Sequence, residues 1–217
     1  GFITGGFRPT NSNTENWIGQ VYLYRENEDI PIDDNGKAML PLLQICLEGL
    51  PYIPDALKGS KVLTIFVSEN MPGRLAYNGD AWVIREYKEE DVLVVKDIYM
   101  QSSSRIKPYP LKSQLITEDY PVWDSGDIPM DIEDELVEME DSGEITDYYD
   151  YTDCFAGHKI GGYPNYIQSG IDFGDGYEFM IQIASDEKAN LNIIDSGNFY
   201  LAKNSQTGDW RLYCDFY

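Results

Sequence analysis

His158, the one histidine in the sequence, is the natural candidate for proton transfer near neutral pH. Cys154 precedes it by four residues in the stretch "DCFAGHKIGGYPNYIQ" and could serve as a nucleophile. A nucleophile and its base must meet in space, and this spacing in a loop permits the contact without requiring it. Cys46 and Cys214 lie far from this stretch, so a zinc site would need several carboxylates. We therefore expect no metal centre, no cofactor and reduced thiols.

The glycine-rich turn after His158 favours an architectural role instead. Gly161 and Gly162 permit backbone conformations that are costly for other residues, and Pro164 fixes the turn that follows. These are requirements of a fold, so we expect no catalytic residues and a binding protein rather than an enzyme. The alternative is a hydrolase or small-ligand-binding protein that uses carboxylates near His158 and Cys154.

Most of the chain is predicted to form β-structure. Apolar runs typical of buried strands occupy residues 39–47 and 61–68, and a second such pair occupies residues 177–185 and 197–204. An Asn-Gly-Asp turn between aromatic stretches in "RLAYNGDAWVIREY" predicts a hairpin, and "DVLVVKDIYM" predicts another strand.

The two strand pairs follow the same order of features. In each half an Ile-Gly pair precedes an apolar strand that carries Gln-Ile, and an aromatic strand comes next. The separation from Gly19 to Gln44 is 25 positions, and that from Gly161 to Gln182 is 21 positions. The similar order and spacing indicate a weak internal repeat.

We therefore predict one domain of the α+β class, rich in β-structure, over residues 1–217. It would contain two related, pseudo-duplicated β units at about residues 15–112 and 154–217. An acidic, partly helical insertion at about residues 113–153 would join them.

That insertion belongs to the most acidic part of the chain. Residues 113–158 contain 15 acids and no Lys or Arg, and so carry 15 of the 22 net negative charges. Ile128, Ile132, Leu136 and Met139 are spaced by 4, 4 and 3 positions, which predicts an amphipathic helix from about residue 130 to 140. The segment is either a solvated loop or a docking surface.

The overall charge narrows the range of partners. The chain has 38 acids against 16 Lys and Arg, a formal net charge of −22, so nucleic acids and anionic membranes are unfavourable partners. A cationic protein is a favourable one. The sequence has no apolar run of about 20 residues, and "GFITGGFRPTNS" lacks the pattern of a secretion signal. We expect a soluble, cytoplasmic protein.

Several motifs carry a family resemblance. "HKIGGYPNYIQ", followed by "FMIQIASDEKANLNIIDSGNFYLAKN", resembles the C-terminal half of the YwqG-like family of bacterial proteins, whose molecular function is unassigned. "IGQVYLYRENEDIPIDDNGKAMLPLLQICLEGLP" is similar to the N-terminal motifs of that family. Gln20 and Val21 depart from its Gly-x-Pro continuation, and "NIIDSG" lacks its Trp-Gly. The resemblance covers nearly the whole chain and supplies no catalytic residues.

The resemblance also implies a biological context, because members of this family occur beside bacterial polymorphic and contact-delivered toxins. With the charge, it favours an immunity or antitoxin-like protein that neutralises a cationic toxin domain, such as one acting on nucleic acid, by direct contact. A self-associating structural protein is a further alternative, and the sequence leaves the oligomeric state open. We expect the partner contacts to come from acids and tyrosines of the acidic segment: Asp124, Asp127, Asp131, Glu133, Asp134, Glu135, Glu138, Asp141, Glu144, Asp147, Tyr148, Tyr149, Asp150 and Tyr151.

Overall fold

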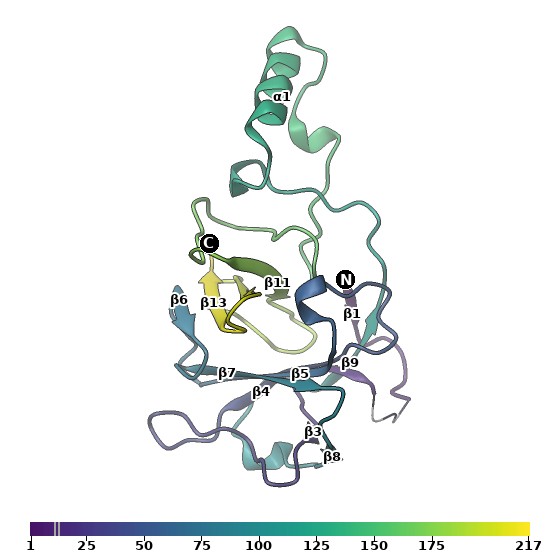
Figure 1. The fold of residues 1–217 in the computed structure, drawn as a ribbon, viewed down its shortest axis with the longest axis vertical. Coiled ribbons are helices and arrows are strands. Elements are labelled where there is room, and N and C mark those ends of the chain that lie inside the picture. Colours follow the sequence, from purple (N-terminus) through teal and green to yellow (C-terminus); the bar gives the residue numbers. More distant parts are fainter. Residues whose placement is uncertain (11, 13) are drawn as a thin grey trace.

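Two antiparallel sheets pack against each other and form the body of the molecule (Figure 1). The computed structural model describes residues 1–10, 12 and 14–217. Over these residues the strand order is β1-β9-β2-β4-β5-β7 in the first sheet and β10-β11-β12-β13-β6 in the second, while β3 and β8 form a separate pair. The strands are β1 (Phe2–Thr4), β2 (Asn16–Ile18), β3 (Leu23–Tyr24), β4 (Leu40–Cys46), β5 (Ser60–Val67), β6 (Leu75–Tyr77), β7 (Trp82–Lys88), β8 (Val94–Val95), β9 (Tyr109–Ser113), β10 (Lys159–Ile160), β11 (Tyr177–Ala184), β12 (Asn198–Asn204) and β13 (Trp210–Asp215).

The four predicted buried strands form β4, β5, β11 and β12, which lie inside their sheets. Their apolar runs are continuous because both faces of these strands are covered. Side chains from the two sheets meet in one core, and smaller clusters cover the outer faces. The core includes Leu43, Ile45, Leu63 and Ile65 from the first sheet and Ile181, Ile183, Phe199 and Leu201 from the second. This shared core makes the chain a single, strand-rich domain.

The two sheets share a local geometry around a glycine. Gly19 follows β2 and Gly161 follows β10, with φ angles of 74° and 68°. The Gly19 N–H donates to the Leu42 carbonyl, and the Gly161 N–H donates to the Met180 carbonyl, each at 2.8 Å. Both acceptors lie where the strand register shifts by one residue. A left-handed conformation in so tight a contact favours glycine at both positions.

A buried glutamine supports each of these turns. Gln44 pairs with β2 and Gln182 pairs with β10 at equivalent register positions. The side-chain oxygen of each glutamine accepts a hydrogen bond from the N–H four residues after Gly19 or Gly161. The side-chain nitrogen donates to the carbonyl four residues before the same glycine. These partners are Leu23 and Glu15 for Gln44, and Asn165 and Gly157 for Gln182.

A half-buried carboxylate joins the two sheets. Glu86 on β7 accepts hydrogen bonds from Lys203 Nζ on β12 at 2.8 Å and from Trp210 Nε1 on β13 at 3.1 Å. Lys88 and Ser60 also donate to Glu86. Burial alone would raise the pKa of Glu86, but Lys203, Lys88 and Ser60 lower it to about 2. The ionised carboxylate therefore links strands from both sheets.

The Asn-Gly-Asp turn does not form the predicted hairpin. The turn is present, with the Asp80 N–H bonded to the Tyr77 carbonyl, but β6 before it pairs with β13 and β7 after it pairs with β5. The Asn78 side chain bonds both backbone groups of Ile84 on β7. The turn therefore passes the chain from one sheet to the other.

The strand predicted over residues 91–100 is also mostly wrong. Only β8 (Val94–Val95) pairs, because its partner β3 is equally short. Beyond β8, Lys96 Nζ donates to the carbonyls of Glu26 and Glu28, which holds the segment against a loop.

The acidic segment contains α1 (Met130–Ser142), the single α-helix in the described part of the chain, where a helix was predicted. Asp131 and Glu133 in its first turn suit the positive end of the helix dipole, and Gly143 ends it with a φ of 77°. The short 3₁₀ helices are η1 (Asp55–Leu57), η2 (Tyr99–Gln101), η3 (Trp123–Ser125) and η4 (Tyr148–Asp150). None of these helices, over the residues described, has the length and apolar character that a membrane crossing needs.

Candidate functional site

His158 is buried and fully engaged in structural hydrogen bonds. Its Nδ1 accepts the Ala184 N–H at 3.1 Å, so its Nε2 carries the proton that it donates to Asp186 Oδ2 at 3.1 Å. Burial alone would raise the pKa of Asp186, but hydrogen bonds, foremost that from His158, hold it well below its usual range. His158 therefore fixes the segment before β10 to the end of β11.

Cys154 is not paired with His158 but lies beside an ion pair. Its Sγ is 3.7 Å from Lys159 Nζ, which binds both carboxylate oxygens of Asp119 at 3.0 and 3.1 Å. Burial raises the pKa of the Cys154 thiol, and the nearby Lys159 only partly opposes this shift. The thiol is therefore a poor nucleophile. Within the described residues, no three His, Cys, Asp or Glu side chains are grouped to hold a metal ion.

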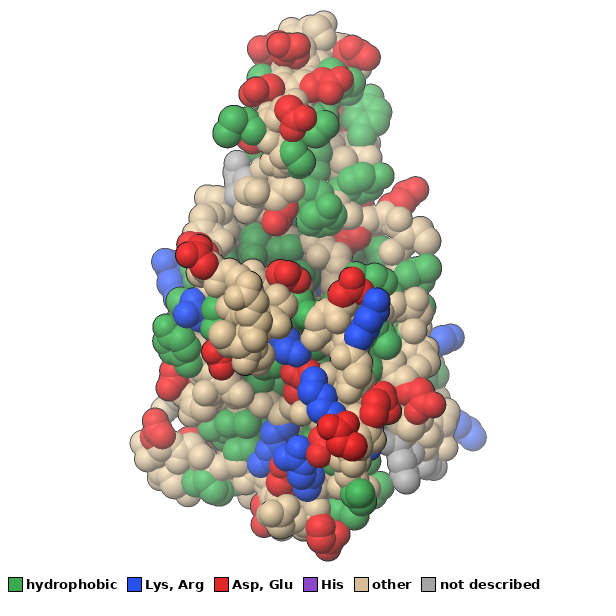
Figure 2. Space-filling view, in the orientation of Figure 1, with side chains coloured by type: hydrophobic (Ala, Val, Ile, Leu, Met, Phe, Trp, Pro, Cys, Tyr) green, Lys and Arg blue, Asp and Glu red, His purple; other side chains and the backbone are tan. Residues whose placement is uncertain are grey.

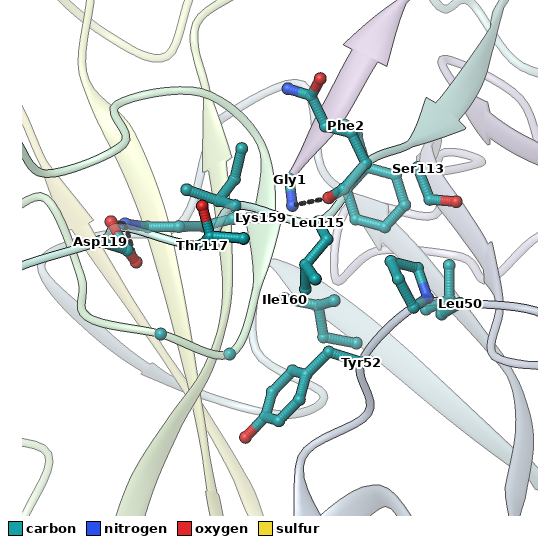
Figure 3. A pocket seen from close by; sticks show the side chains of 15 residues that line it. Gly1, Phe2, Leu50, Tyr52, Ser113, Leu115, Thr117, Asp119, Lys159 and Ile160 are labelled. Carbon is teal, nitrogen blue, oxygen red and sulfur yellow. Dashed lines mark hydrogen bonds and ion pairs between the residues drawn. The ribbon is translucent and has the colours of Figure 1, made fainter.

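A cavity of about 280 Å³ lies next to this ion pair (Figure 3). Its walls come from β1, the loop after β4, residues 113–117 with Asp119, and β10 with the turn that follows it. Phe2, Leu50 and Ile160 contribute apolar wall, and Asp119 and Lys159 form a polar end. Sequence reasoning missed this site because its residues are scattered along the chain and no motif connects them.

Residues 118–153, which we call the acidic arm, project from one end of the body (Figure 1). The arm contains α1, and none of the 13 residues of that fully described helix is buried. The two ends of the arm lie next to each other, since the Tyr120 N–H donates to the Asp153 carbonyl at 3.0 Å. The arm therefore presents a surface that is separate from the two sheets.

An aromatic cluster orders the base of the arm. The Tyr148 ring lies 5.2 Å from the rings of Trp123 and Tyr149, and its hydroxyl donates to the Pro121 carbonyl at 2.9 Å. The Tyr149 hydroxyl accepts the Trp123 N–H at 3.0 Å. Glu140 on α1 accepts the Tyr148 N–H at 2.9 Å, which ties the helix to this cluster. The arm therefore has its own small core.

The structure separates the predicted partner contacts by role. Tyr148 is buried in the aromatic cluster, Asp147 accepts the Tyr149 N–H as the cap of η4, and Glu133 is half-buried. The side chain of Asp124 lies outside the described residues. Asp147 is nevertheless exposed, as are all the others, namely Asp127, Asp131, Asp134, Glu135, Glu138, Asp141, Glu144, Tyr149, Asp150 and Tyr151.

Exposed apolar residues of the arm were not among the predicted partner contacts. Met130, Ile132 and Val137 on α1 are all exposed, Met130 by 77%. The predicted apolar stripe of the helix included Ile128, which instead lies before the helix and is buried. The apolar residues of α1 therefore remain in contact with solvent.

Comparison with known protein families gives a match over most of the chain. A family model described as a domain of unknown function (DUF1963) matches residues 18–206, which include the central strands of both sheets and the arm. A search of curated proteins gives no match. The matched description names no activity.

Proposed function

We propose that this chain, which belongs to the family of domains of unknown function DUF1963, is a binding module whose acidic arm docks a cationic protein. The observation that carries the proposal is the separation of charge. The arm has 15 acids and no Lys or Arg, whereas the remaining residues have 23 acids and 16 Lys and Arg, a net charge of −7. Figure 2 shows acidic and hydrophobic side chains together over the projecting arm.

The arm has both components of a protein interface. Its carboxylates supply long-range attraction that steers a cationic partner and speeds association. Tyr149, Tyr151 and Met130 supply exposed aromatic and apolar area that holds the complex after encounter. The aromatic cluster at the base of the arm keeps this surface ordered, so less conformational entropy is lost on binding.

The partner that we propose is a bacterial toxin domain with a basic substrate surface, such as a nuclease, neutralised in the cytoplasm by direct contact. The YwqG-like resemblance supports this context, and the charge of the arm supports the mode of binding. A folded acidic surface can cover a phosphate-binding site without any catalytic residue.

We also propose that the two β units arose by internal duplication. The matching contacts of Gly19 with Gly161, and of Gln44 with Gln182, support this origin. In that case the arm is an insertion between the two units.

The test is reversal of charge on the exposed face of α1. A double variant, Glu135→Lys with Glu138→Lys, is compared with Glu89→Lys and Glu90→Lys, which are exposed on the body and change the net charge equally. The assay is stopped-flow association with a panel of basic bacterial toxin nuclease domains, together with their residual nuclease activity.

The expected result is inhibition of at least one panel member by the wild-type chain, with association slowed about 10-fold by the arm variant at low salt. The body variant should slow association much less. Equal slowing by both double variants would show that the arm is not the docking surface. Normal nuclease activity of every panel member would overturn the toxin assignment.

A further inference from the structure

We propose that the cavity beside Asp119 and Lys159 receives a bulky apolar or aromatic side chain of the cationic partner. This inference rests on the proposed function and deepens it by naming the anchor that the partner must present. The arm would attract the partner, and the cavity would fix its position.

The size of the cavity suits such an anchor. Its volume is about 280 Å³. Roughly 150 Å³ of apolar cavity is enough to bind benzene, so a Phe, Leu or Met side chain would fit here. Phe2, Leu50 and Ile160 line the cavity and would contact that side chain (Figure 3). Burial of one aromatic side chain in such walls is a large contribution to an interface.

The charged end of the cavity does not favour an ionic ligand. Lys159 is almost completely buried and binds both oxygens of Asp119. Those oxygens also accept the N–H groups of Phe155 at 2.8 Å and Tyr163 at 3.1 Å. A charged ligand would have to break these contacts in a poorly solvated place. The Gly1 amino group also lines the cavity and donates to the Gln114 carbonyl at 2.9 Å (Figure 3). The remaining free surface of the cavity is best matched by an apolar group.

The rim resembles a protein-binding hot spot. Tyr52 and Leu115 line the cavity yet are 52% and 57% exposed, and Tyr120 and Tyr163 next to Asp119 are also exposed. Exposed aromatic residues around a pocket can shield a buried anchor from water. This rim gives a partner a broad contact area around the cavity.

The acidic arm next to the cavity favours a partner with positive charge around the anchor. The wall formed by residues 113–117 continues directly into the arm, and Glu118, which does not line the cavity, is exposed at this junction. Lys or Arg residues that flank the apolar anchor would therefore face carboxylates. The expected recognition element is an apolar or aromatic residue between basic residues.

The proposal can be tested with three synthetic probes, the capped peptides Lys-Lys-Phe-Lys-Lys, Lys-Lys-Ala-Lys-Lys and Glu-Glu-Phe-Glu-Glu. Each is titrated into the ¹⁵N-labelled 217-residue chain and followed by NMR. The Phe peptide with lysines should bind about 10-fold more tightly than the Ala peptide and shift the amides of Leu115, Ile160 and Gly162. The acidic Phe peptide should bind much more weakly.

Two variants of the chain test whether the Phe side chain of the peptide binds in the cavity. Ser113→Trp should fill the cavity, and Thr117→Trp at the exposed rim should cover its mouth with little risk to folding. Ser169→Trp, in an exposed loop away from the cavity, is the matched control. Both cavity variants should lose the preference for Phe over Ala while the control keeps it.

The outcomes separate the two proposals. Equal binding of the two lysine peptides, or a Phe preference that survives both cavity variants, would refute the cavity anchor even if binding remains salt-dependent. Equal binding of the lysine and glutamate Phe peptides would instead refute the cationic partner and leave the apolar cavity supported. A Phe preference that disappears only when the cavity is filled supports the inference.

Discussion

Replacing Glu86 by Gln should destabilise the protein because this carboxylate links the two sheets. The substitution keeps the size of the side chain and removes its charge. It leaves the ammonium group of Lys203, which is nearly buried, without a carboxylate partner. Loss of one member of a buried ion pair is costly because the remaining charge is poorly solvated.

The size of the effect follows from the pKa of Glu86, which is lowered from 4.5 to about 2. Each pKa unit corresponds to about 1.4 kcal/mol, so the ionised carboxylate contributes about 3 kcal/mol to the free energy of unfolding at pH 7. Because the folded-state pKa is the lower one, this stability is complete above the unfolded value of 4.5. It is lost as the pH falls toward 2.

The assay is urea unfolding followed by the fluorescence of the four tryptophans, at several pH values between 7 and 3. Glu86→Gln should lower the free energy of unfolding by about 3 kcal/mol at pH 7, and by progressively less as the pH falls below 4.5. The control is Glu69→Gln, which removes the exposed ion pair with Lys37 and should have little effect. A loss below about 1 kcal/mol at pH 7, or an equal loss at pH 7 and pH 3, would refute the reasoning.

Two further predictions test the structural roles of Gly161 and His158. Gly161→Ala should cost about 2 to 3 kcal/mol, because its φ is positive and a Cβ atom would lie 2.5 Å from Tyr52 Cε1. Gly143→Ala, with a similar φ but open space around it, should cost only about 1 kcal/mol, and equal costs in urea unfolding would contradict the close contact at Gly161. His158→Ala should cost about 2 to 3 kcal/mol because Asp186 loses a buried partner. The same variant should leave peptide titrations unchanged, and a folded His158→Ala protein that no longer binds would indicate a direct role for the histidine.

Sequence reasoning predicted the elements whose signals are local. The apolar runs of β4, β5, β11 and β12 were sufficient to identify buried strands, because few other structures accommodate such runs between turns. The 4, 4 and 3 spacing predicted α1 within two residues of its ends. The order of Gly19 and Gln44, and of Gly161 and Gln182, marked positions that make matching hydrogen bonds.

Features that depend on distant residues were not predictable in the same way. The turn at residues 78–80 has a hairpin sequence, but the sheets that β6 and β7 join depend on partners far along the chain. Glu86 meets Lys203 across 117 positions, and no local pattern marks either residue. The cavity likewise requires β1, β9 and the turn after β10 to be in place.

The hydrogen bond between the Tyr120 N–H and the Asp153 carbonyl has a consequence for how the protein can diversify. It joins the two ends of the arm, so these ends are held together independently of the sequence between them. The entropy of closing a loop rises slowly with length, by about 0.6 kcal/mol for each doubling. Arms of other lengths and sequences can therefore be exchanged on the same sheets at small cost. A lineage, or a protein engineer, can replace the recognition surface without redesigning the scaffold.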